Sequence, residues 1–154
     1  MGRGVAALRG RVFVMYHPTC PTVDHARREV TAYLKLRSHF ESMLMLIWVG
    51  QPFPPPENDV RQMYREGFAR GPQVESVAWV VDSSRSMGAS IYNSLSMQIF
   101  PRTTNSRVFR EPFEAAGWLS NFDGADADVE NILDGLDTLD RAVPESFTYS
   151  ESRV

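Results

Sequence analysis

Several features that would assign this 154-residue chain to a functional class are scarce or missing. Its single cysteine, Cys20, excludes a disulfide within the chain, which fits a reducing compartment. The longest uninterrupted apolar run, residues 43–49, is far shorter than the roughly 20 residues that a membrane-spanning helix needs. The N-terminus also lacks the pattern of a signal peptide. We therefore expect a cytoplasmic protein without membrane insertion.

Sequence motifs for cofactors and nucleic acids are missing as well. No glycine-rich phosphate-binding loop follows a predicted strand, and no basic run is interleaved with aromatic residues, so neither a nucleotide cofactor nor nucleic-acid binding is expected. A hydrolase elbow is not present, because Gly88, Ala89 and Ser90 fall inside a predicted helix, which argues against a triad with Asp24 and His25.

A metal site is suggested only weakly. His17, Cys20 and His25 lie close together in sequence, but no fourth ligand follows at a characteristic spacing, and two prolines restrict the segment. The sequence therefore predicts no metal, no cofactor and no catalytic residue.

Charge is distributed unevenly along the chain. Residues 1–122 carry 14 basic and 10 acidic side chains, whereas residues 123–154 carry 2 basic and 9 acidic ones. We interpret this as one domain over residues 1–122, followed by an acidic amphipathic helix over about 126–143, ended by Pro144, and a frayed tail. This segment can cover the domain, contact a partner or remain solvated, and its leucine stripe also permits a homodimer.

The hydrophobic pattern predicts alternating strands and helices. We expect strands at residues 5–8, 11–16, 43–49, 77–81 and 107–109. Helices are expected at 22–40 and 57–69, in a segment that ends at Ile99, and in a segment that begins at Pro112. In the helix that begins at Pro112, we expect Phe113, Ala116 and Leu119 to face the core. The run 43–49 has no polar interruption, which is typical of a central strand covered on both faces. The sequence thus predicts an α/β fold with a mixed central sheet of about five strands flanked by helices, plus the extra acidic C-terminal helix.

Polar residues cluster between the strand at 77–81 and the helix that follows it. Five of them can offer hydrogen bonds: Asp82, Ser83, Ser84, Arg85 and Ser86. Because a helix N-terminus carries the positive end of the helix dipole, this joint favours an anion, a phosphate or an acidic partner loop. Ser90 continues a stripe of small side chains along the helix, and Phe53 lies in a proline-rich loop after the central strand. These residues are the predicted partner- or anion-binding site.

The element order over residues 4–122 resembles the STAS domains, the fold of anti-anti-sigma factors, and in particular the SpoIIAA-like group. Asp82-Ser83-Ser84 is similar to the Asp-Ser-Ser-Gly-Leu motif of those factors, whose first serine is phosphorylated by a partner kinase. Trp118-Leu119 is similar to the end of the closing helix in SpoIIAA-like proteins. Arg85 stands where the motif has glycine, and Ser86 and Met87 replace its leucine.

This resemblance implies a non-catalytic protein-interaction module in bacterial signalling or regulation, with a regulatory protein as its partner and Ser83 as a phosphorylation switch. Three small polar residues at a strand-to-helix joint also serve as ordinary helix caps, which is the simpler interpretation of the same residues. Two other functions stay open: a binding protein or small enzyme for an anionic small molecule at this joint, and a structural adaptor that uses the acidic helix.

Overall fold

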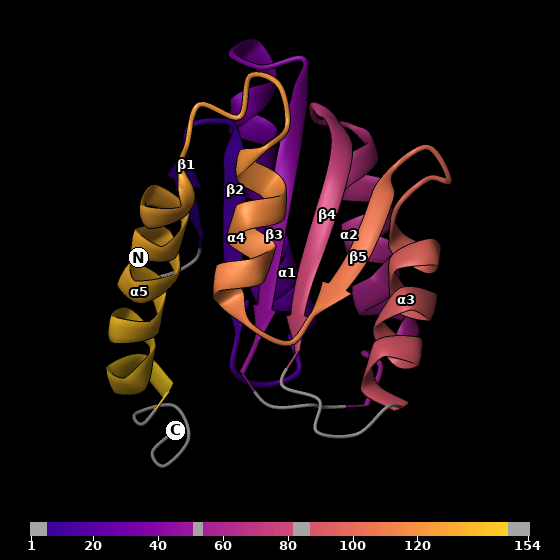
Figure 1. The fold of residues 1–154 in the computed structure, drawn as a ribbon. Coiled ribbons are helices and arrows are strands. Elements are labelled where there is room, and N and C mark those ends of the chain that lie inside the picture. The colour runs from indigo at the N-terminus through magenta and orange to yellow at the C-terminus, as the bar shows by residue number, and fades with distance from the viewer. Residues whose placement is uncertain (1–5, 51–53, 82–86, 148–154) are drawn as a thin grey trace.

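The fold, taken from a computed structural model, is described for residues 6–50, 54–81 and 87–147 (Figure 1). Only the backbone is described at residues 87–88 and 142–147. The strands are β1 (Ala7–Arg9), β2 (Val12–His17), β3 (Ser42–Val49), β4 (Gln73–Val81) and β5 (Asn105–Phe109). The helices are α1 (Val23–Leu34), the short 3-10 helix η1 (Lys35–Ser38), α2 (Asn58–Ala69), α3 (Met87–Ile99), α4 (Pro112–Ser120) and α5 (Val129–Phe147).

A five-stranded mixed sheet forms the centre, with the strands side by side in sequence order. β1 and β2 are antiparallel, and the pairs from β2 through β5 are parallel. The hairpin between β1 and β2 turns at Gly10, which has a φ of +57°. A Cβ there would lie 2.3 Å from the carbonyl oxygen of Asp126, so only glycine fits. The predicted α/β class, with its mixed sheet of five strands, is confirmed.

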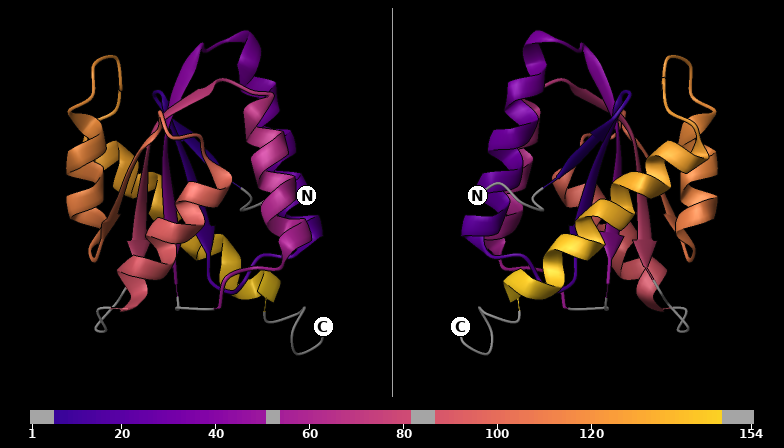
Figure 2. Two further views of the ribbon diagram at one scale, coloured as in Figure 1. Left: turned by 90° about the vertical axis from the view of Figure 1, so that its right-hand side faces the viewer. Right: turned by 90° about the vertical axis from the view of Figure 1, so that its left-hand side faces the viewer.

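Side chains of the sheet alternate between two apolar layers. Phe13 and Met15 of β2 point into the layer formed with α1, α2 and α3, whereas Val12 and Val14 point into the layer formed with α4 and α5. Figure 2 shows these helices on opposite faces of the sheet. β3 lies in the middle and residues 43–47 are all buried, as the uninterrupted apolar run predicts.

The acidic helix α5 belongs to the second layer. Its Ile132, Leu136 and Leu139 are at most 3% exposed and pack with residues of β2, β3 and α4. Arg9 forms an ion pair with Asp134 of this helix at 2.9 Å. In the part of α5 whose side chains are described, these three residues of the leucine stripe are therefore buried within the chain, and α5 covers the sheet.

Two expectations for the C-terminal helices are wrong. Phe113, at the first turn of α4, is 65% exposed, whereas Ala115, Ala116 and Leu119 of the same helix are 0% exposed. α5 begins only at Val129, since Asp126 has a φ of +54° that a helix does not permit, and it continues past Pro144 to Phe147. A proline in the last turns removes one backbone hydrogen bond, and this helix continues without it.

Candidate functional site

Most of the predicted site lies outside the described residues. Asp82, Ser83, Ser84, Arg85 and Ser86 form one such segment, and Phe53 belongs to another. Ser90 is described and is exposed on α3. The structure does describe the chain on either side of these two segments, and this part of the chain borders two hollows along α3.

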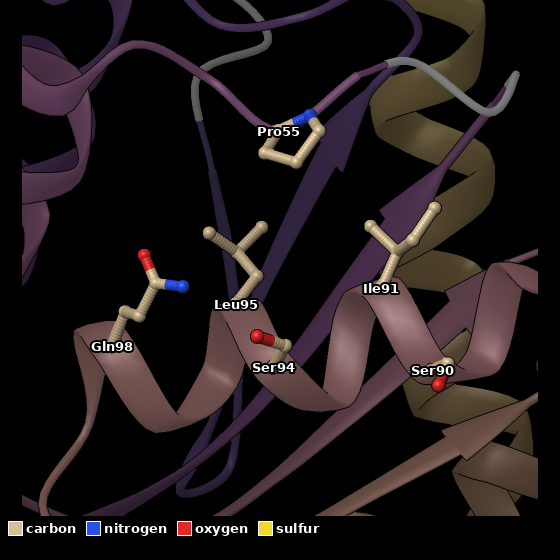
Figure 3. Close-up of a pocket in the computed structure, with 6 residues that line it drawn as sticks. All are labelled: Pro55, Ser90, Ile91, Ser94, Leu95 and Gln98. Atoms are coloured by element: carbon tan, nitrogen blue, oxygen red, sulfur yellow. The ribbon is translucent and has the colours of Figure 1, made fainter.

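The first hollow lies between α3 and the proline-rich loop. It has a volume of about 400 Å³ and is lined by Pro55, Ser90, Ile91, Ser94, Leu95 and Gln98. Figure 3 shows Pro55 facing Ile91 and Leu95 across it, with Ser90 and Ser94 on the same helix. The small serine side chains leave room beside the apolar pair, as the predicted serine stripe suggests.

The second hollow lies on the other side of Gln98, which lines both hollows. Its volume is about 500 Å³, and its lining includes Phe68, Met97 and Phe100. Met97 is 77% exposed, so most of this apolar side chain is in contact with water. Arg65 of α2 also lines this hollow, and its guanidinium donates to the Gln98 carbonyl oxygen at 3.5 Å. We call the exposed side of α3 together with these two hollows the α3 surface.

The helix that forms this surface carries no charge. α1 and α2 each contain four Asp, Glu, Lys or Arg residues, whereas the 13 residues of α3 contain none. Among the described side chains of α3, the exposed ones are uncharged: Ser90, Asn93, Ser94, Met97 and Gln98. A solvent-facing helix normally carries charged residues on its outer face, so this one is an exception.

A second candidate site lies in the core beside β2, where four polar side chains meet. The His17 Nε2 atom is 2.8 Å and 2.9 Å from the two carboxylate oxygens of Glu29. The His25 Nε2 atom lies 3.3 Å from Glu29 Oε2, and the Tyr64 hydroxyl donates to Glu29 Oε1 at 2.5 Å. We call His17, His25, Glu29 and Tyr64 the His–Glu cluster.

Burial and charge act against each other at Glu29, which is 0% exposed. Burial alone raises the pKa of a carboxyl group, because water no longer solvates the charge. The positive charge and hydrogen bonding of His17, with a smaller contribution from His25, outweigh this and lower the pKa of Glu29 to about 2. The cluster therefore keeps an ionised carboxylate in the core.

Local sequence explains how the cluster assembles. His17 is the last residue of β2, and Pro18 and Pro21 lead the chain to Thr22, whose hydroxyl accepts a hydrogen bond from the His25 amide at 3.2 Å and caps α1. Four residues separate His25 from Glu29, so both lie on the inner side of α1. Tyr64 reaches the same point from α2.

The imidazoles of the cluster reach a small cavity of about 110 Å³ near the surface. His17, His25 and Arg28 line it together with the segment that contains Cys20. Partial burial, and then the negative charge of Glu57, raise the pKa of the Cys20 thiol above its ordinary value. A thiol with a raised pKa is not an activated nucleophile.

Sequence reasoning considered His17 and His25 but missed Glu29 and Tyr64. The missed signal is the position of Glu29, which falls between the buried residues Ala26, Val30 and Tyr33 on α1. A carboxylate on the apolar side of a helix needs a partner in the core, and the nearby histidines were the available partners.

The comparisons with known proteins add no assignment. No protein-family model matches the chain, and neither a curated protein nor a solved structure is significantly similar to it. The STAS resemblance therefore stays a prediction. Within the described residues, no helix is both long and apolar enough to cross a membrane.

Proposed function

We propose that this chain is a non-catalytic protein-interaction module that binds a partner protein along the α3 surface. The observation that carries the proposal is the exposed helix without charge. The cores of protein–protein interfaces are depleted in charged residues and enriched in methionine and aromatic residues. α3 combines this depletion with a methionine that is 77% exposed.

The shape of the surface supports the same function. The two hollows lie side by side along α3 and share Gln98, so one extended or helical segment of a partner can reach both. Each hollow has room for a large apolar anchor side chain, and such anchors supply most of the binding energy in interfaces. Ser90 and Ser94 let the partner's backbone approach closely.

The chemistry of the partner follows from the lining. Apolar residues match Ile91 and Leu95 in the first hollow and Met97 in the second. A carboxylate matches Arg65, which lines the second hollow. The partner segment is therefore apolar at two positions and acidic at one end.

Regulation by phosphorylation belongs to the same proposal. α3 begins immediately after Ser86, so a phosphate on Ser83 would bring about two negative charges close to the N-terminal end of the α3 surface. Such a charge would compete with an anionic group of the partner for the N-terminal end of α3. In keeping with the STAS resemblance, we place the module in a bacterial signalling circuit.

A photo-crosslinking amino acid at position 94 tests the proposal in native cell extract. We expect proteins to be crosslinked from position 94 that are lost when Met97→Asp is added and retained when Thr31→Arg is added. Thr31 is exposed on α1, away from the α3 surface, and serves as the matched control. Crosslinked proteins that are insensitive to Met97→Asp would contradict the proposal.

Two further measurements separate the alternatives. Sedimentation of the pure protein identifies a second copy of the chain as the partner if Met97→Asp abolishes self-association. Ser83→Glu should weaken binding of the crosslinked partner while Ser83→Ala keeps it, and equal binding by both variants would remove the phosphorylation switch.

A small-molecule site is the second candidate, favoured by the size of the hollows. Volumes of about 400 and 500 Å³ fall in the range of ligand pockets. A rise in melting temperature with phosphate-bearing metabolites, lost in Arg65→Gln, would support this function. A flat screen would leave the protein partner as the occupant.

A further inference from the structure

The His–Glu cluster brings together ligand types that bind metals. His17, His25 and Glu29 each offer one ligand atom, and these three atoms lie within 4.8 Å of one another. They come from two successive elements, the end of β2 and the first turns of α1.

Distances in the cluster are close to those around a metal ion. Two ligand atoms bound at about 2.0–2.1 Å to a tetrahedral zinc ion lie about 3.3 Å apart. The His25 Nε2 atom lies 3.3 Å from Glu29 Oε2, and the His17 Nε2 atom lies 2.8 Å from the same oxygen. To admit an ion, His17 would need to retreat from this oxygen by about half an ångström.

We infer that His17, His25 and Glu29 form a binding site for a divalent transition-metal ion of the zinc type. Two imidazoles and one carboxylate suit zinc, iron(II) or cobalt(II), whereas magnesium and calcium prefer sites built from oxygen ligands alone. The site is separate from the α3 surface, and neither proposal depends on the other.

Surrounding groups support such a site. The Tyr64 hydroxyl donates to Glu29 Oε1 and fixes the carboxylate, as hydrogen-bonded neighbours of metal ligands commonly do. Glu29 is 0% exposed, and a carboxylate bound to a cation at this position offsets part of the charge of that cation.

The remaining coordination position opens toward the cavity of about 110 Å³, which His17 and His25 both line. Cys20 also lines this cavity, but its Sγ atom lies 3.9 Å from the Pro54 carbonyl oxygen and stands outside the group of three ligand atoms. We assign the open position to water or a small exogenous ligand. A zinc ion held by three protein ligands keeps its fourth position for water or an exogenous ligand.

A proton is the competing occupant of the cluster. The contact of His17 Nε2 with both Glu29 oxygens is also the geometry of a buried ion pair, in which a proton holds the two side chains together. Metal binding and the ion pair make opposite predictions when the chain is given zinc.

Zinc binding to the full chain, freed of metals with EDTA and dialysed, tests the site. Isothermal titration with Zn²⁺ should show one ion per chain. His25→Ala should weaken Zn²⁺ binding by more than about 100-fold, and Tyr64→Phe by roughly 10- to 100-fold. His39→Ala is the matched control, because His39 is exposed and does not belong to the cluster, and its affinity should equal that of the unmodified chain.

Binding of cobalt(II) gives a spectroscopic readout of the metal ligands. The Co²⁺-loaded chain should show visible absorption typical of four- or five-coordinate cobalt with nitrogen ligands, and Cys20→Ser should leave the spectrum unchanged. If Cys20→Ser changed the spectrum, the Cys20 thiolate and not water would be the fourth ligand. Our assignment of the open position would then be wrong.

The outcomes decide between metal and proton. Absence of Zn²⁺ binding and of a Co²⁺ spectrum would overturn the site and leave a buried ion pair. Equal loss of affinity in His25→Ala and His39→Ala would also overturn it, since the binding would then be adventitious. Circular dichroism of each variant confirms that lost binding is not lost folding.

Discussion

The His–Glu cluster and the α3 surface invert the usual arrangement of a globular protein. The cluster holds an ionised carboxylate and the His17 imidazole in the core, with Glu29 at 0% exposure. The α3 surface instead presents Met97 at 77% exposure on a helix without charge. Lysine, arginine, aspartate and glutamate are normally outside, and large apolar side chains inside. Each region therefore departs from what folding alone favours.

The two departures have opposite consequences for stability. A buried carboxylate depends on its partners, because an unpaired charge in the core is costly. An exposed methionine on α3 contributes little to folding, because it keeps most of its surface in water. Changes in the cluster should thus reduce the free energy of unfolding, and changes on the α3 surface should reduce binding alone.

The largest effect is expected from Glu29→Gln. Glutamine keeps the volume of the side chain but removes the negative charge that pairs with His17, so we expect the free energy of unfolding to fall by about 3–5 kcal/mol. Urea denaturation in the presence of EDTA measures this without any metal contribution. Glu66→Gln is the control, because Glu66 is exposed on α2, and it should change stability by less than about 0.5 kcal/mol. A similar small effect for both variants would show that the cluster is not a stabilising ion pair.

Tyr64→Phe should have an intermediate effect. It removes the hydroxyl that donates to the Glu29 carboxylate, and hydrogen bonds to charged groups contribute about 1.5–3 kcal/mol. Tyr33→Phe provides the comparison, because the Tyr33 hydroxyl donates to the neutral Pro72 carbonyl oxygen at 2.7 Å and both tyrosines are buried. We expect about 0.5–1.5 kcal/mol for Tyr33→Phe. The same urea experiment ranks the two, and a larger loss for Tyr33→Phe would contradict the charged state of Glu29.

The sequence predicted the fold because most of its signals are local. The uninterrupted run at 43–49, the turn at Gly10 and the proline at the first position of α4 each act within a few residues, and each is found where it was expected. The predictions that failed concern Phe113 and Pro144. The burial of Phe113 depends on how α4 packs on the rest of the chain, and the end of α5 depends on whether the helix tolerates a proline. Neither property is encoded by neighbouring residues alone.

The candidate sites were less predictable, for two physical reasons. The His–Glu cluster joins residues from β2, α1 and α2, and Tyr64 lies 47 positions after His17, so no spacing rule reveals it. The α3 surface could have been found in part, because the absence of charge over residues 87–99 is visible in the sequence. Ser90 was identified through the serine stripe, and the hollow it lines required the position of Pro55 from a different loop.

The smallest effect on stability is expected from Met97→Asp. The side chain is 77% exposed, so replacing it removes little buried area, and surface substitutions of this kind change the free energy of unfolding by about 0.5 kcal/mol or less. Urea denaturation checks this value. Phe113→Ser is a control outside the α3 surface, because Phe113 is another large apolar side chain that is mostly exposed, at 65%. A loss above about 1 kcal/mol would mean that Met97 packs within the chain in solution. A folded Met97→Asp variant that loses its crosslinked partner, beside a Phe113→Ser variant that keeps it, would show that the chain exposes Met97 for binding and not for folding.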